Sequence, residues 1–250
     1  MGKLSFEELA SLSFESFRRL ALDPELSEHE RVGFPDVYRA GKIEAIAGDI
    51  AGKLFVGAAQ GGVYLEIGPG SSSLAVRLIE MARERGLAVY LVDSPEMLAG
   101  LPDGPDVVKV AGKFPDVASE LEGIRGQVQC ALAYSVAHYA FAEGMLEAFV
   151  DSVLELLAPG GRFLLGDIPN ESKRMRFLRS PRGAEFARRF LATYGANSAI
   201  DRGKLAELDD RVLLKLLERA RQEGFDAYLL LQAPELPMAN RREDLLFVRP

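Results

Sequence analysis

Two glycines on either side of a proline, Gly68-Pro69-Gly70, stand between an apolar run at 63–68 and an amphipathic stretch at 72–85. Glycine allows backbone conformations and close approaches that other residues resist, and the free N–H groups of a helix start point toward a bound ligand. The three serines after Gly70 are of the type that caps such a helix. The segment therefore predicts a turn that holds a nucleotide-like ligand, although an ordinary strand-to-helix turn would have the same glycines.

Two acidic residues accompany this turn. Asp93 ends the next apolar run, 23 residues after Gly70, which is near the spacing at which a carboxylate accepts hydrogen bonds from ribose hydroxyls. Its alternative role is to cap the helix that Ser94-Pro95 would begin. Glu66 is either a buried carboxylate that binds neighbouring backbone or a direct contact of the ligand. A dinucleotide turn does not require Glu66 and has Gly or Ala where this chain has Ser73, so an NAD-dependent oxidoreductase is a weaker alternative.

Two further residues could act as a base. His138 follows the apolar run at 128–134, and a neutral imidazole suits proton removal near neutral pH. Asp167 ends the run at 162–167 and offers a carboxylate for the same task. A structural hydrogen bond for His138 and a capping role for Asp167 are the competing interpretations.

A cationic segment follows Asp167. Residues 171–182 contain five Lys or Arg and one acid, in a chain whose formal net charge is −7. Arginine binds phosphate and carboxylate through its planar guanidinium, so Arg174 and Arg176 are predicted to bind an anionic acceptor. A solvated loop and helix start would have the same composition.

The hydrophobic pattern after Val63 predicts the elements that position these residues. Short apolar runs alternate with longer amphipathic ones, which is typical of a parallel sheet with helices on both faces. The last two runs are joined by eleven residues with two prolines, too few for a crossover helix, so they should pair antiparallel. The predicted strands are 63–68, 88–93, 106–111, 128–134, 162–167, 225–232 and 244–250, and the predicted helices are 72–85, 95–99, 115–122, 144–157, 183–194 and 204–223.

The N-terminal part of the chain lacks this alternation. Helical stretches at 6–22 and 38–54 are separated by a polar, proline-containing segment. The sequence therefore predicts an N-terminal helical cap at 1–58 over an α/β domain at 59–250.

The turn and its companions resemble those of class I S-adenosylmethionine-dependent methyltransferases. The resemblance begins near Val63, extends to the C-terminus, and rests on 66–70, on Asp93, on Leu157-Ala158-Pro159-Gly160-Gly161 and on the reversed final hairpin. It implies a Rossmann-like α/β fold: seven mostly parallel strands with an antiparallel last strand, and helices on both faces. It also implies S-adenosylmethionine bound across the strand ends.

By position, the resemblance assigns the cofactor contacts. Gly68 and Gly70 would lie under the methionine portion, and Asp93 would hold the ribose. Many family members have an acid for the adenine amino group where this chain has Lys113, which cannot accept a hydrogen bond, so adenine would pack on Phe114 instead. The residues implied to contact the cofactor are Glu66, Gly68, Gly70, Asp93, Ser94, Met97, Gly112, Phe114, Tyr134 and Ser135.

The activity implied is methyl transfer to a small anionic acceptor, with oxygen as the favoured acceptor atom and a sugar or nucleotide-sugar as one candidate. The predicted acceptor contacts are Tyr38 and Arg39, for which surface packing is the competing interpretation, with Tyr139, Arg174 and Arg176. His138 or Asp167 would be the base. The alternative is a non-catalytic protein of the same shape that binds a partner through its basic segment.

The composition argues against several other classes of protein and of binding site. The excess of acidic residues argues against a nucleic-acid-binding protein, and no apolar run reaches the ~18 to 20 residues of a membrane-spanning helix. With one cysteine and two histidines, neither a disulfide nor a metal site is expected. The N-terminus does not have the pattern of a signal peptide, so a cytoplasmic location is expected, and a homodimer is left open.

Overall fold

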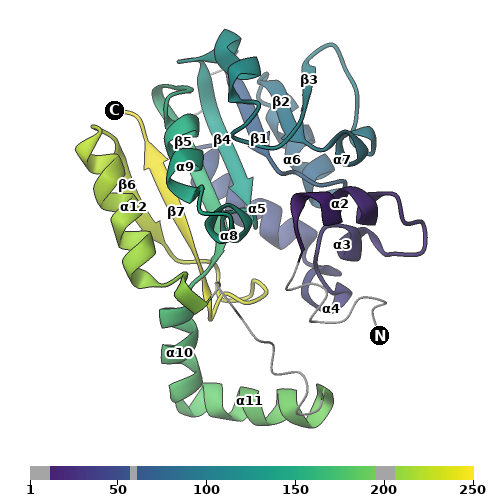
Figure 1. Ribbon diagram of the computed structural model, residues 1–250, viewed down its shortest axis with the longest axis vertical. Helices are drawn as coiled ribbons and strands as arrows, with labels where there is room; N and C mark the ends of the chain where they lie inside the picture. Colours follow the sequence, from purple (N-terminus) through teal and green to yellow (C-terminus); the bar gives the residue numbers. More distant parts are fainter. Residues whose placement is uncertain (1–11, 57–60, 195–205) are drawn as a thin grey trace.

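Seven strands form one sheet in the computed structural model, which describes residues 12–56, 61–194 and 206–250 (Figure 1). The strand order is β3-β2-β1-β4-β5-β7-β6. β1 to β5 run parallel, whereas β7 is antiparallel to both β5 and β6, which confirms the predicted Rossmann-like sheet with its reversed last strand. The strands are β1 (Val63–Ile67), β2 (Ala88–Asp93), β3 (Val107–Ala111), β4 (Val128–Tyr134), β5 (Leu157–Pro169), β6 (Asp226–Leu230) and β7 (Arg242–Val248).

Helices cover both faces of this sheet. Alternate strand residues point to opposite faces, so Leu65 and Ile67 lie in one core and Tyr64 lies in the other. One face carries α5 (Ile43–Leu54), α6 (Ser73–Arg83) and α7 (Pro95–Ala99), and the other carries α8 (Ala137–Ala142), α9 (Leu146–Leu154) and α12 (Asp210–Gln222). None of the helices in the described part of the chain is long and apolar enough to cross a membrane.

Three short helices, α2 (Phe14–Ala21), α3 (Glu28–Arg31) and α4 (Asp36–Arg39), lie beyond the carboxyl ends of the parallel strands (Figure 1). Arg18 of α2 donates hydrogen bonds of 2.8–3.1 Å to the Glu96 carboxylate at the start of α7. We call α2 to α4 the cap. α5 is different, because its buried side chains Ile46 and Ile50 pack in the sheet's core. The predicted domain boundary at residue 58 falls outside the described residues.

A helical arm follows β5. It consists of α10 (Glu171–Arg179) and α11 (Pro181–Tyr194), which extend away from the sheet in Figure 1. Asn170 begins the arm, because its side chain accepts a hydrogen bond of 3.2 Å from the Lys173 N–H. The sequence predicted α11 but not α10 or α8.

Several predicted boundaries were wrong for local reasons. The helix predicted at 38–54 is two helices, α4 and α5, separated at Gly41, whose φ of 70° is not helical. The helix predicted at 115–122 is a 3₁₀ helix, Ala118–Ile124. β5 begins at Leu157 rather than 162, because Leu157 already pairs with Val128 of β4.

Two further predicted helix starts, at residues 6 and 204, are not seen as predicted. α12 begins at Asp210, because Asp209 caps it by accepting from the N–H groups of Arg211 and Val212. The predicted helix start at 204 and most of the first turns predicted from residue 6 lie outside the described residues.

Candidate functional site

A cavity lies between the carboxyl ends of the strands and the cap. Counting the open solvent at its mouth, it encloses about 1170 Å³. The lining comes from the turn after β1, the ends of β2 and β4, α8 and the cap. The sheet and the cap therefore build this cavity together.

The turn after β1 forms the floor of the cavity. Gly68 and Gly70 have φ values of 71° and 64°, which is the left-handed region where side chains are strained. A Cβ on Gly68 would lie 2.6 Å from Val136 Cγ2, and one on Gly70 would lie 2.5 Å from Val32 Cγ1 of the cap. Both glycines are thus required by backbone geometry, Gly68 also by the close approach of Val136 and Gly70 by that of the cap.

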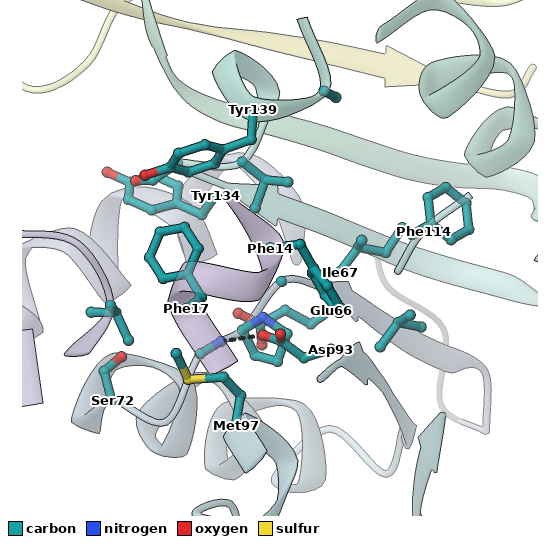
Figure 2. A pocket seen from close by; sticks show the side chains of 18 of the residues that line it. Phe14, Phe17, Glu66, Ile67, Ser72, Asp93, Met97, Phe114, Tyr134 and Tyr139 are labelled. Atoms are coloured by element: carbon teal, nitrogen blue, oxygen red, sulfur yellow. Dashed lines mark hydrogen bonds between the residues drawn. The ribbon is translucent and has the colours of Figure 1, made fainter. Parts of the chain in front are cut away.

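Asp93 ties this turn to the end of β2. Its Oδ2 accepts a hydrogen bond of 2.9 Å from the Gly70 N–H, drawn as a dashed line in Figure 2, and its Oδ1 accepts one of 2.7 Å from the Ser94 N–H. Burial raises the pKa of Asp93 to about 6, although these two N–H groups oppose the rise. The carboxylate lines the cavity and holds the turn in position.

Glu66 lies beside Asp93 in the cavity wall (Figure 2) and is 3% exposed. The Tyr64 hydroxyl donates a hydrogen bond of 2.7 Å to Glu66 Oε2. Burial raises the pKa of Glu66 to about 8; the Tyr64 hydrogen bond opposes this and the negative charge of Asp93 adds to it. A cationic ligand group placed here would favour the ionised carboxylate.

The start of α6 corrects one expectation. The serines after Gly70 were predicted to cap this helix, but Ser72 at the N-cap makes no side-chain capping hydrogen bond. Glu28 of α3 does so instead, accepting a hydrogen bond of 2.9 Å from the Ser73 N–H. A carboxylate is favourable at the positive end of the helix dipole, and it fixes the cap over the turn.

Three of the residues predicted to hold adenine line the cavity. Met97, Gly112 and Phe114 line it, and Phe114 packs edge-to-face on Phe149 with ring centroids 5.0 Å apart. Ser94 is not a lining residue, because it is fully buried and its hydroxyl caps α7. Lys113 forms a 2.5 Å ion pair with Glu143 at the cavity wall.

Aromatic residues line another part of the cavity. In Figure 2, Phe17, Tyr134 and Tyr139 lie on one side of Glu66 and Asp93, and Phe114 lies on the other. Phe17 of the cap packs edge-to-face on Tyr139 of α8, with centroids 5.1 Å apart. The cap is thus part of this compartment rather than a cover above it.

Arg39 is the cation of this compartment. It is 6% exposed, and its guanidinium carbon lies 3.9 Å from the centroid of the Phe34 ring. Its Nη2 donates a hydrogen bond of 2.8 Å to Ser135 Oγ and lies 3.5 Å from Asp167 Oδ2. The predicted cavity residues Arg39, Tyr134, Ser135 and Tyr139 therefore come together.

The two predicted bases occupy other positions. The oxygens of Asp167 accept from Ser135, Arg242 and Gln232 as well as Arg39, and Asp167 does not line the cavity. His138 is also absent from the lining; it is 8% exposed, and its ring packs on Tyr139 at a tilt of 40°, with centroids 3.9 Å apart. A role as base stays a prediction for both, without a cavity contact to support it.

Three predicted acceptor residues lie outside the cavity lining: Tyr38, Arg174 and Arg176. Arg174 forms a 2.7 Å ion pair with Glu171 within α10. Arg176 is exposed and pairs with Asp210 at the start of α12. Sequence reasoning took their charge as available, but neighbouring carboxylates already neutralise both arginines.

Comparison with known proteins identifies the fold. No family model and no curated protein matches the sequence. Among solved structures, the plantazolicin methyltransferase BamL in complex with a desmethylPZN analogue and SAH aligns with a TM-score of 0.59, over 96% of this chain and 97% of that one, at 13% identity. The chain has the class I methyltransferase fold.

Two further structures of this fold are similar to the chain. The plantazolicin methyltransferase BpumL, in complex with SAH, aligns with a TM-score of 0.57 at 11% identity, over 94% of this chain and 96% of that one. Magnesium protoporphyrin IX methyltransferase (ChlM) from Synechocystis PCC 6803, with bound SAM, gives 0.50 at 14% identity, over 97% and 93%. These alignments extend over more of the chain than the sequence resemblance, which began near Val63.

Sequence reasoning missed most of the cap's contribution to this class I methyltransferase fold. It predicted a cap but assigned only Tyr38 and Arg39 to the site. The amphipathic pattern of α2 indicated an apolar face but not what that face covers. The additional cap residues that line the cavity are Phe14, Phe17, His29, Val32 and Phe34.

Proposed function

We propose that this protein is an S-adenosylmethionine-dependent methyltransferase that acts on a small acceptor. The observation that carries the proposal is the Asp93–Gly70 hydrogen bond, which joins a carboxylate at the end of β2 to a left-handed glycine turn at the end of β1. In an open α/β sheet, ligands bind in the crevice at these strand ends. Two of the similar structures named above contain SAH and one contains SAM.

The residues present fit this cofactor. The Asp93 carboxylate suits ribose hydroxyls, the buried Glu66 carboxyl suits an ammonium group, and the turn leaves no room for a Cβ beneath the ligand. Met97 and Phe114 offer apolar surface for a flat base. The cofactor would supply an electrophilic methyl group.

The protein's own part is to orient the acceptor and to exclude water. Phe17, Tyr134 and Tyr139 surround the space next to the cofactor residues, and Arg39 supplies a positive charge in the same wall. Holding two reactants in the correct geometry removes much of the entropic barrier of a bimolecular reaction. The Phe17–Tyr139 contact closes this space from the cap side.

The residues that line the cavity also suggest the chemical class of the acceptor. Aromatic walls favour an acceptor with an apolar or aromatic portion, and Arg39 favours one with negative charge. Oxygen stays the predicted acceptor atom. A sugar acceptor stays a prediction that none of the described contacts specifically supports.

Calorimetric titration tests the cofactor assignment. The protein should bind S-adenosylmethionine and S-adenosylhomocysteine but not NAD, and Asp93→Asn should weaken both affinities by about tenfold or more, because it removes a charged acceptor. The matched control is Asp103→Asn, since Asp103 is exposed and pairs only with Lys109 in the described contacts. Absence of binding by the folded wild-type protein would contradict the proposal.

A second measurement separates an enzyme from a non-catalytic binding protein. Release of S-adenosylhomocysteine is followed with a panel of phenols, carboxylic acids and sugars. Turnover that is lost in Arg39→Gln but not in Arg176→Gln supports catalysis at the cavity. Cofactor binding without turnover on any acceptor would favour the binding protein.

A further inference from the structure

Arg241 occupies an unusual position just outside the cavity. It is the last residue of the β6–β7 connection, and its guanidinium lies between two rings that come from distant segments. The guanidinium carbon is 5.9 Å from the centroid of Tyr38 in the cap and 5.5 Å from that of Phe186 in α11. Figure 1 shows the arm and the β6–β7 connection next to each other below the sheet.

The neighbouring cations each have an acidic partner. Arg174 pairs with Glu171 at 2.7 Å, Arg242 with Asp167 at 3.1 Å, and Lys173 with Glu243 at 3.6 Å. Arg241 differs: within the described ranges, no carboxylate lies within ion-pair distance of it. Its side-chain hydrogen bond there is donated to the Asn240 side-chain oxygen, at 3.3 Å.

The surroundings of Arg241 disfavour its charge. Burial lowers its pKa, and repulsion by Arg242 and Arg174 lowers it further, while Tyr38 acts in the opposite direction. A shielded cation without a counter-ion is costly, and such groups concentrate at ligand-binding sites. An anionic ligand group would remove this cost and leave the two rings as side walls.

Arg241 is also connected to the cavity wall. Its chain neighbour Arg242 lies 5.8 Å from the Phe34 centroid, and Arg39 lies 3.9 Å from the same ring. Phe34 and Arg39 line the cavity, and Tyr38 is the chain neighbour of Arg39. Arg241 is therefore linked to the cavity-lining residues Phe34 and Arg39 through its neighbour Arg242 and through Tyr38, neither of which lines the cavity itself.

We propose that Arg241 binds an anionic group of the acceptor, a carboxylate or a phosphate monoester, at the outer edge of the cavity between Tyr38 and Phe186. This deepens, and rests on, the proposed function. The acceptor then extends from the aromatic compartment past Phe34, and its charged end is recognised by Arg241 rather than by Arg176.

Calorimetry with simple probes tests this site. The full-length protein, with and without saturating S-adenosylhomocysteine, is titrated with benzoate, phenyl phosphate and the neutral benzyl alcohol. The two anions should bind more tightly than benzyl alcohol, and the stronger of them identifies the carboxylate or phosphate class. Arg241→Gln should weaken anion binding by about tenfold or more and leave benzyl alcohol unchanged.

Two variants serve as controls. Arg176→Gln removes an arginine of the same region whose charge is already paired with Asp210, and it should leave anion binding unchanged. Arg241→Lys keeps the charge but loses the planar fork, and it should restore part of the affinity. Thermal unfolding and S-adenosylhomocysteine affinity show whether each variant is folded.

The outcomes are distinct. Three results would each overturn the proposal. The first is equal anion affinity in wild type and Arg241→Gln, and the second is a loss of affinity in Arg176→Gln as large as that in Arg241→Gln. The third is no preference of the wild type for anions over benzyl alcohol. If S-adenosylhomocysteine does not bind but the anions bind through Arg241, the proposed cofactor fails while the anion site stands.

Discussion

Ser135 Oγ donates a hydrogen bond of 2.5 Å to Asp167 Oδ2, and both residues have positive φ, 62° and 57°. Ser135 directly follows β4, and Asp167 lies near the carboxyl end of the adjacent parallel strand β5. Non-glycine residues in this conformation cluster at functional sites, where the surrounding contacts maintain the strain. Arg39 from the cap contacts both side chains, so this pair connects two sheet strands to the residue that enters the cavity wall.

Replacing Asp167 should be far more harmful than replacing Ser135. Asp167 is 2% exposed, and Asp167→Asn leaves the buried Arg39 and the half-buried Arg242 without their shared counter-charge, which should cost about 3–5 kcal/mol of unfolding free energy. Ser135→Ala removes hydrogen bonds only and should cost about 1–3 kcal/mol. Urea unfolding measures both, and equal losses would contradict a role for Asp167 as counter-ion.

Glu66 should make stability fall as pH rises. Its pKa is raised on folding to about 8, so between the ordinary value near 4.5 and about 8 the unfolded chain has released a proton that the folded protein retains. The unfolding free energy should therefore decrease by up to about 1.4 kcal/mol per pH unit from this residue. The stabilising contribution of the Glu66 proton is fully present below pH 4.5 and is lost as the pH rises toward 8.

Glu66→Gln tests this dependence. In urea unfolding at pH 5, 6.5 and 8, the unfolding free energy of the variant should rise relative to that of the wild type as the pH increases. Asp93, with a pKa raised to about 6, contributes the same sign at lower pH in both proteins. Glu80→Gln is the control because Glu80 is exposed. Parallel wild-type and Glu66→Gln profiles would show that Glu66 titrates normally.

Gly70→Ala should disturb both folding and the cofactor site. The variant combines a left-handed alanine with a Cβ placed 2.5 Å from Val32 Cγ1, which should cost about 2–4 kcal/mol. Gly86→Ala isolates the strain, because Gly86 has φ of 68° and no atom within 4 Å of the added Cβ. The measurements are thermal unfolding and S-adenosylhomocysteine affinity.

Val32→Ala provides the complementary test. In the Gly70→Ala background it removes the contacting methyl groups, so part of the lost stability and affinity should return. If the double variant is no better than Gly70→Ala alone, close packing of the cap on the turn is not the cause.

Arg18 should hold the cap on α7. Arg18→Ala removes the hydrogen bonds to Glu96, so chymotrypsin should cleave near Phe14 and Phe17 faster than in the wild type. Arg19→Ala is the matched control, since Arg19 is on the same helix and its described side-chain hydrogen bond is to Ser16. Arg18 holds the pKa of Glu96 at about 2, so the protection should persist from pH 8 down to pH 4. Equal cleavage of both variants would argue against this contact.

The residues at the turn were predictable because their roles are local. A strand, two glycines and a helix start follow one another in the chain, and Asp93 ends the next strand of the same βαβ unit. The serines failed as helix caps because Glu28, which lies 45 residues away in sequence, takes the Ser73 N–H. Arg176 is not a free cation, because Asp210, 34 residues after it in sequence, pairs with it.

The amino-acid sequence alone determined the order of strands and helices, the reversed strand β7, the glycine turn and the acid that ends β2. Each of these is specified by hydrophobic period, connection length or backbone freedom within a short stretch of chain. Only the tertiary structure decided which charges are paired and which side chains enclose the cavity. Arg39 meets Asp167 across 128 residues and Arg18 meets Glu96 across 78, and such contacts depend on how the layers pack together.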